Sequence, residues 1–431
     1  MQPLLWRGCT IFRMAQSLAN YDAALKNIYA PGLRNSINNS NPILTEVVHD
    51  TENVSGRKCI WAVHSGRSAS TGARAEFGTL PTADRQRYIA PEDDLAYLYH
   101  TIKVSGQAKH LTQNNAGAFA KALDQEMTGA EKDIKNDLAR QMFNAAVTID
   151  AALVVGAYAQ CFTITDSTHI VIESLEALDA DAAANSADSV FRPFFVGLVC
   201  DTVTPATGAI SATFTITGIT KSTGTIQTTT NTGATEDDYI FRSGNYGVAG
   251  GEGNEINGLR YLTGTQDYAG VTASTNPIWN GNAVGSTSTG ISENLLESAI
   301  EIVQTDGDGS TPSFALAEHS QGRKLAVIAQ QAKRFAPPAV TLEAGWKGIE
   351  VAGLSLVFDR FCPTQDIFVL TPSELAWFVG LDWTWDDDDG KVLYKALDGS
   401  DAVEARFKAY VNLQTYTRNA HTAVKAAVPS F

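Results

Sequence analysis

The sequence is poor in positive charge, in cysteine and in long apolar runs, and each shortage argues against a class of protein. Lys and Arg number 32 against 47 Asp and Glu, so the net charge of −15 disfavours a general grip on nucleic acid or on an anionic membrane. The five cysteines are scattered without CxxC spacing, which favours reduced thiols in a cytoplasm. No apolar run reaches the roughly 18 residues of a membrane span, so we expect no membrane partner.

Motifs of catalysis are also missing. The seven histidines form no H-E-x-x-H or Cys/His cluster, which disfavours zinc, and neither a G-x-S-x-G elbow nor a Walker A loop occurs. The glycine-rich G-V-A-G-G-E-G-N-E opens no amphipathic helix, so we interpret it as a linker instead of a phosphate cradle. We therefore expect no catalytic residues, no cofactor and no metal.

One acidic run needs separate treatment, W-T-W-D-D-D-D-G at Trp383–Gly390. An EF-hand loop has glycine at its sixth position and oxygen ligands at its first and last. Placing Gly390 sixth puts Trp385 first and Ala396 last, so both ends fail. Adjacent like charges repel one another outside water, and we interpret Asp386–Asp389 as a solvated turn. A metal-dependent hydrolase built on these aspartates is the alternative from another class.

The N-terminal 55 residues predict an extended arm. Tyr21, Leu25 and Tyr29 have helical spacing before A-P-G, which predicts a short helix in this arm. The opening M-Q-P-L-L-W-R-G has no long apolar core and is not a secretory signal. Met14 opens a more ordinary start, so we expect the preceding residues to be an upstream start-site artefact.

Residues 56–108 predict a long β-hairpin. G-R-K-C-I-W-A-V-H and Y-L-Y-H-T-I-K-V have strand composition, and the polar stretch between them has almost nothing to bury. A two-stranded ribbon is marginal alone, so a neighbouring subunit is expected to support it. Residues 57–90 hold six basic and two acidic groups, which favours docking on an acidic surface over a merely soluble loop. The expected contact residues are Arg67, Arg74, Glu76, Phe77, Leu80, Arg85 and Arg87.

Within residues 109–150, the stretch from Asn114 to Val147 predicts one long amphipathic helix. Apolar residues recur at steps of three and four, and charged residues fill the other face. About 30 residues at ~1.5 Å each give a helix roughly 45 Å long. The expected packing positions are Phe119, Leu123, Met127, Ile134, Leu138 and Met142.

The rest of the chain divides into three parts that differ in composition and in residue pattern. Residues 151–253 alternate in short β-type runs, and their eleven acidic against three basic residues suggest an acidic, β-rich inserted domain. Residues 254–385 mix helix and strand patterns. Residues 386–431 end in a long strand in which Ala405 to Leu413 alternate with polar residues. Trp383 and Trp385 are expected to divide their roles, one packing in the core and one facing a neighbour.

This order of elements resembles the HK97-fold major capsid protein of tailed phages, apart from about 151–253. E-F-G-T-L-P (76–81) is similar to the hairpin-tip pattern of that family's E-loop. The predicted helix that begins at Asn114 is similar to the family's spine helix. G-L-S-L-V-F-D-R-F-C-P-T-Q-D-I-F-V-L-T-P (353–372) looks like the family's strand pair. The implied fold is α+β, with an N-arm at 1–55, an E-loop hairpin at 56–108, a peripheral domain with spine helix at 109–150, a β-rich insertion at 151–253, an axial domain at 254–385 and return strands of the peripheral domain at 386–431.

The resemblance implies a structural protein and not an enzyme. Its members self-assemble into hexamers and pentamers of an icosahedral phage head, so we expect the main partner to be the chain itself. The resemblance also implies that the arm reaches along adjacent subunits and contacts them through Tyr21, Leu25 and Tyr29. Portal and scaffolding proteins and a decoration protein are the other implied partners, with double-stranded DNA enclosed without specific binding. The implied location is the virion, assembled in the bacterial host cytoplasm. An encapsulin-like compartment shell is the alternative with the same fold.

One family trait is not expected here. Some relatives join a hairpin lysine to a neighbour's asparagine, but Gly66 to Arg87 contain no lysine, and an arginine that stays charged is not a usable nucleophile. Assembled particles boiled in detergent should therefore run as single chains on a denaturing gel. A ladder of covalent oligomers would contradict this prediction.

Overall fold

A computed structural model of the chain describes residues 37, 41–107, 116–173, 175, 191–247, 253–286, 288–307, 309–333, 339–341, 347–351, 353–387, 391–396 and 399–427. The chain divides into two compact units. One contains Tyr99–Asp133 and Trp383–Lys408, and the other contains Ile37–Leu98, Ile134–Asp382 and Ala409–Phe431. Within the described ranges, no helix combines the length and the apolar character that a membrane crossing requires.

The longest strand is β24 (Ala402–Thr415), and it organises a five-stranded sheet. The sheet has the order β1 (Val48–Asp50), β22 (Leu375–Trp385), β24 and β23 (Tyr394–Lys395), and β7 (Ala96–Ser105) also pairs with β24. Ala405, Phe407, Ala409, Val411 and Leu413 of β24 are buried. The polar residues between them are half-buried up to Tyr410, as the alternation predicts.

The hairpin differs from its prediction in one limb. The strand β7 was expected as the returning limb, but β4 (Val63–Gly66) pairs with β5 (Arg87–Ile89), and β3 (Lys58–Ile60) pairs with β6 (Glu92–Asp94). At the base of the hairpin, a short β2 (Val54–Ser55) pairs with β3, so that β2, β3 and β6 form a three-stranded sheet. The physical reason is burial, because β7 has alternating exposed and covered residues and needs a sheet with a core. The exposed ribbon could not supply one.

Helix α5 (Ala116–Gln141) occupies most of the predicted Asn114–Val147 stretch, but it ends six residues before the predicted end, and Ala146–Ile149 form strand β8 instead. Met127, Ile134 and Leu138 are buried on it, and Met142 is buried immediately after its end. The side chains of Phe119 and Leu123 lie outside the described residues. The N-terminal positions Tyr21, Leu25 and Tyr29 lie outside them altogether.

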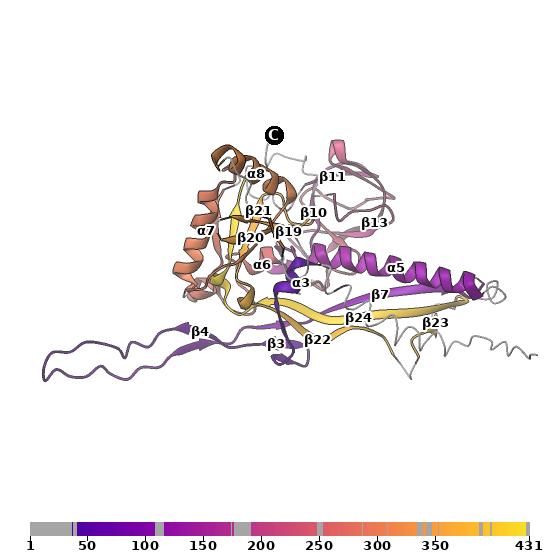
Figure 1. Cartoon of the computed structure of the whole chain (residues 1–431). Helices are drawn as coiled ribbons and strands as arrows, with labels where there is room; N and C mark the ends of the chain where they lie inside the picture. Colours follow the sequence, from indigo (N-terminus) through magenta and orange to yellow (C-terminus); the bar gives the residue numbers. More distant parts are fainter. Residues whose placement is uncertain are drawn as a thin grey trace, which may run out of the picture. The chain divides into compact units, whose positions relative to one another are not determined.

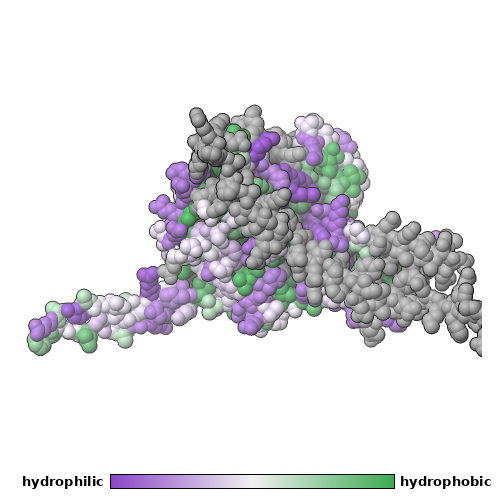
Figure 2. Space-filling view, in the orientation of Figure 1, coloured by the Kyte–Doolittle hydropathy of each residue, from purple (hydrophilic) through white to green (hydrophobic). Residues whose placement is uncertain are grey.

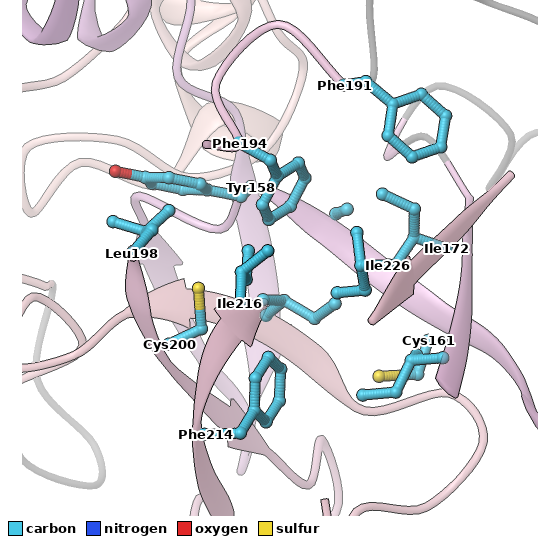
Figure 3. Close-up of a cluster of buried hydrophobic side chains, with 13 residues drawn as sticks. Tyr158, Cys161, Ile172, Phe191, Phe194, Leu198, Cys200, Phe214, Ile216 and Ile226 are labelled. Carbon is cyan, nitrogen blue, oxygen red and sulfur yellow. The ribbon is translucent and has the colours of Figure 1, made fainter. Parts of the chain in front are cut away.

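A closed six-stranded barrel occupies the acidic β-rich segment. Its strands follow the order β10 (Ala159–Asp166), β11 (His169–Glu173), β14 (Thr225–Thr228), β13 (Ile210–Thr220), β12 (Val199–Val203) and β15 (Tyr239–Arg242). Closure leaves no open sheet edge, which protects a domain rich in Thr and Ser from edge pairing. Phe214, Ile216 and Cys200 are among the side chains that fill the interior (Figure 3). Ile210 lies on the same strand as Phe214 and Ile216, β13, but it is exposed.

A mixed seven-stranded sheet follows, covered by two helices. The strand order is β16 (Asn282–Gly285), β25 (Thr422–Lys425), β21 (Asp366–Leu370), β17 (Phe314–Ala317), β20 (Leu354–Phe358), β19 (Lys347–Val351) and β18 (Ala339–Thr341). Leu296 and Ala299 of α7 (Glu293–Asp306) and Leu325 of α8 (His319–Lys333) share its core.

The expected boundary at 385/386 does not separate the sheets. β22, expected in the axial domain, belongs to the five-stranded sheet, while β25 at the C-terminus is an interior strand of the seven-stranded sheet. β25 pairs in parallel with β16 and antiparallel with β21. Its apolar residues Ala423 and Val424 are buried there, with Val424 at 0% exposure. Long-range pairing of this kind has no local sequence signal.

The two connections of the barrel meet at a buried ion pair. Arg140 of α5 lies 2.7 Å from Glu255, which follows the barrel, and stacks over the ring of Tyr158, which precedes it, at 4.1 Å. Asn144 donates to Glu255 Oε2 at 2.9 Å, and Asn245 donates to its Oε1 at 2.5 Å. Burial opposes the charge of Arg140, but the carboxylate of Glu255 outweighs it and raises the arginine pKa above its ordinary value. We call these five residues the barrel root.

Glu255→Gln should destabilise this unit strongly. The change keeps the side-chain size but leaves Arg140 buried without its main counter-charge, and breaking a buried pair costs about 3–5 kcal/mol. Urea unfolding followed by circular dichroism measures the loss. The matched control is Arg242→Gln, whose partly exposed pair with Asp137 at 3.6 Å should contribute at most about 1 kcal/mol. Equal losses in the two variants would refute a special role for the barrel root.

The C-terminal segment carries a second set of buried polar groups. Arg418, fully buried, donates to the carbonyls of Leu262 and Tyr261 at 2.8 Å each, and burial lowers its pKa to about 10. His421 is also fully buried; Thr371 N–H donates to its Nδ1 at 3.3 Å, and its Nε2 lies 3.0 Å from Thr415 Oγ1. Burial lowers the His421 pKa to about 3.

His421 should make stability fall in acid. Its ring is neutral in the folded chain, while the unfolded chain takes up a proton below about pH 6.5. The stabilising contribution is therefore complete above that pH and is lost as pH falls toward 3. Carboxylates titrate in the same range, so the measurement is the difference in slope of unfolding free energy against pH between the wild type and His421→Gln. Identical slopes for the wild type and His421→Gln would contradict this role of the buried ring.

Candidate functional site

The aspartate run offers no enzyme-like centre within the described residues. Asp386 accepts from Lys408 Nζ at 2.5 Å and from the Tyr394 hydroxyl at 3.2 Å, and the Lys408 contact is the main reason that its pKa is lowered. Asp387 is exposed, and Asp388 and Asp389 lie outside the described residues. Across the parts of the chain that the structure describes, no group of three or more His, Cys, Asp or Glu is placed to hold a metal.

The two tryptophans beside this run do not divide their roles as predicted. Trp383 and Trp385 are both buried, and both contact Phe407, with ring centroids 5.4 Å and 5.0 Å away. The reason is elementary strand geometry, because residues two apart in a strand point to the same face. Neither tryptophan is therefore available to a neighbour.

The hairpin between β4 and β5 is exposed and rich in Gly, Ser, Ala and Arg. Figure 1 shows it as an extended two-stranded ribbon, and Figure 2 shows hydrophilic and hydrophobic residues mixed along it. Trp61 and Val63 at its base are buried, whereas residues 71–80 are all exposed. The ribbon therefore has an anchored base and no core of its own.

Side chains hold the ribbon together where regular pairing stops. Asp84 Oδ2 accepts from Ala69 N–H at 3.0 Å, and Gln86 Oε1 accepts from Ser68 N–H at 3.2 Å. The Ala69 bond is the main reason that the pKa of Asp84 is lowered. Sequence reasoning missed Asp84 and Gln86, although Asp and polar residues that bond nearby backbone are typical of turns.

The tip of the ribbon is a defined turn. Gly78 N–H donates to Ala75 C=O at 2.9 Å, and Phe77 between them has a φ of 62°. Such a φ is a genuine outlier for a bulky residue and costs roughly 1–3 kcal/mol. A Cβ on Gly78 would lie 3.0 Å from the Ala75 oxygen, so glycine suits that position. Phe77 itself is 98% exposed and Leu80 is 78% exposed.

The four hairpin arginines do not have equal roles. All are exposed, but Arg74 turns back on the tip and donates from Nε to Thr79 C=O at 2.7 Å and from Nη1 to Ala73 C=O at 2.8 Å. We call Arg74 to Leu80 the tip turn. At the base, Arg57 lies 3.5 Å from Asp94 and Lys58 lies 2.8 Å from Glu92, so these two cations are neutralised locally.

The predicted contact residues thus lie on one ribbon. Arg67, Arg74, Glu76, Phe77, Leu80, Arg85 and Arg87 are all exposed on it. The helix positions form a separate, buried group instead, in which Met127, Ile134, Leu138 and Met142 each have less than a tenth of their surface exposed.

Comparison with known proteins supports the fold. No family model matches the sequence, and no curated protein does. Among solved structures, the capsid asymmetric unit of cyanophage A-1(L) matches with a TM-score of 0.51 and 10% identity, covering 91% of this chain and 94% of that chain. A native GTA particle capsid has a TM-score of 0.43 at 10% identity, covering 91% and 90% of the two chains. The SrpI encapsulin complex of Synechococcus elongatus PCC 7942 has a TM-score of 0.43 at 12% identity, covering 91% and 90%.

The similarity to the cyanophage capsid chain extends over nearly the whole of both chains, at a sequence identity that shows the fold alone. The α+β architecture described above is therefore that of a phage capsid chain. This confirms, at the level of fold, the resemblance that the order of elements predicted.

Arg74→Gln should loosen the tip turn without unfolding the protein. The variant loses the contacts to Thr79 and Ala73, but water can replace them at the surface, so global stability should change by less than about 0.5 kcal/mol. Chymotrypsin should cut after Phe77 faster than in the wild type, because local opening admits the protease. Arg85→Gln is the matched control. Equal cleavage rates in the two variants would contradict the positioning role of Arg74.

Proposed function

We propose that the chain is the major capsid protein of a tailed phage, a structural subunit that self-assembles into the shell of the head. The observation that carries the proposal is the fold, shared with a cyanophage capsid chain over nine-tenths of both chains. The exposed ribbon supports it, since residues 71–80 cover no core within their own chain and are suited to contact with another. The protein acts by assembly and not by catalysis.

The finer proposal is a head built from hexamers and pentamers around double-stranded DNA. The net charge of −15 suits a wall that must hold DNA without adhering to it, because a basic wall would bind phosphates strongly. Portal and scaffolding proteins, and a decoration protein, are the further partners of this proposal. Assembly takes place in the host cytoplasm and the product is the virion.

Within this proposal the regions keep the roles that the resemblance implied. The ribbon acts as the E-loop, α5 as the spine helix, and residues 1–55 as an arm along adjacent subunits. The barrel at 151–253 is an added surface domain, acidic because it faces water. The seven-stranded sheet with α7 and α8 is the axial domain, now including β25.

The direct test is to express the chain alone and with its genomic neighbours and to image the product by negative-stain electron microscopy. Closed polyhedral shells or rings of subunits support the proposal. The contents then separate a phage head, which takes DNA, from an encapsulin-like compartment, which takes cargo protein. A small monomer or dimer under every condition would refute a shell protein, and bound metal in that monomer would favour the hydrolase alternative.

Reversing the ribbon charge should block assembly while leaving the subunit folded. The variant replaces Arg67, Arg85 and Arg87 by Glu and spares Arg74, because Arg74 supports the tip turn. The matched control replaces the same three residues by Lys, which keeps the charge. Shell yield by sedimentation and folding by circular dichroism are the measurements. Normal shells from the Glu variant would show that charge on the ribbon does not drive docking.

A further inference from the structure

We propose that Phe77 is an apolar anchor that a second copy of this chain buries, and that Arg74 is a positioning residue that holds the tip turn ready for it. The inference rests on the proposed function and names the contact through which assembly would be tightest. It also shifts the emphasis from the charge of the ribbon to a single aromatic ring at its tip.

Folding by itself does not explain a phenylalanine at this position. With 98% of its surface exposed, Phe77 packs against essentially nothing in its own chain, so its ring contributes no burial to stability. Its φ of 62° is unfavourable for a bulky side chain, whereas glycine or asparagine would adopt it readily. The chain thus places a large apolar side chain where the backbone disfavours it. A strained backbone at an exposed position indicates a use outside the folded chain.

The tip turn is built to present this ring. The Gly78–Ala75 backbone bond closes the turn, and Arg74 braces it through the carbonyls of Thr79 and Ala73. A preorganised loop loses little conformational freedom when it binds, which strengthens the contact it makes. A central aromatic residue in a partner's pocket is the typical dominant contributor to an interface. Leu80, 78% exposed on the same turn, would extend the apolar contact.

Charge indicates that the occupant is another copy of the same chain. Arg57 and Lys58 at the base are paired with Asp94 and Glu92, so they add no free charge to the ribbon. Residues 66–87 hold four arginines and two acidic residues, a net +2, and since the whole chain carries −15, the rest carries −17. The ribbon is therefore complementary to the surface that most of the molecule presents. Opposite charge would bring the ribbon to that surface, and the ring would then hold it there. A membrane is a poorer partner, because the net charge of the chain repels anionic lipid.

Thiol labelling tests burial of the ring directly. Phe77→Cys and the control Thr82→Cys, further along the exposed ribbon, are made in a Cys9→Ser background, since Cys59, Cys161, Cys200 and Cys362 are all buried. Each variant is assembled as a minority with unmodified chain, so that shell formation does not depend on it. We expect a polar maleimide to react with Phe77→Cys at least about tenfold more slowly in shells than in free subunits, and more slowly than with Thr82→Cys. Equal rates in shells and free subunits would overturn the proposal.

Assembly yield separates the anchor from the fold and from the proposed function. Phe77→Gly should keep the unfolding midpoint at or above that of the wild type, because it relaxes the backbone, yet reduce the yield of sedimenting shells about tenfold or more. Phe77→Leu should restore much of the yield, and Thr82→Ala should leave it unchanged. Wild-type yield from Phe77→Gly would overturn the anchor alone and leave the shell proposal standing. Failure of the wild type to assemble in any condition would overturn both.

Discussion

The buried pair of Arg140 and Glu255 is the interaction on which the arrangement of the larger unit depends. A barrel inserted into another domain is attached through its two ends, and here both ends converge on one carboxylate. Tyr158 leads into the barrel under the guanidinium, and Asn245 leaves it bonded to Glu255. Charges are expensive to bury, and Asn144 and Asn245 reduce that cost by satisfying both carboxylate oxygens. The backbone beside this carboxylate needs a glycine. Gly156 has a φ of 99°, and a Cβ there would lie 3.1 Å from the Glu255 carboxyl carbon.

The ribbon is held by exposed hydrogen bonds, whereas the barrel root is held by a buried ion pair. The ribbon has almost no apolar burial between Gly66 and Arg87, so its shape depends on bonds from Asp84, Gln86 and Arg74 to nearby backbone atoms. Bonds of this kind at the surface contribute little to global stability, because water competes for the same groups. They do restrict the conformations of the ribbon. A segment that is already ordered but makes few contacts loses little conformational entropy when it binds and can gain many new contacts. Both properties favour binding to another subunit.

Charge is distributed between these two regions in a way that bears on assembly. The acidic excess is spread over the barrel and the sheets, whereas the ribbon holds four exposed arginines. The aspartate run contributes to the excess but is partly neutralised within its own unit, because Lys408 holds Asp386. Asp386 of this run therefore has a structural role. Under the proposed function, a local basic ribbon on an otherwise acidic chain suits contact between subunits.

The sequence by itself determined the local elements and their order. Steps of three and four residues predicted α5, alternation predicted β24, and the Gly, Ser and Arg content of 66–87 predicted an exposed ribbon, because each pattern reports which faces a segment can bury. Only the tertiary structure decided which strands pair. β7 joins β24 and not β3, and β25 enters the sheet of β21, since pairing depends on faces brought together from distant parts of the chain. The barrel root, the shared face of Trp383 and Trp385, and the left-handed backbone of Phe77 were decided there too. Such features arise from through-space contacts and backbone angles, and no residue spacing records them.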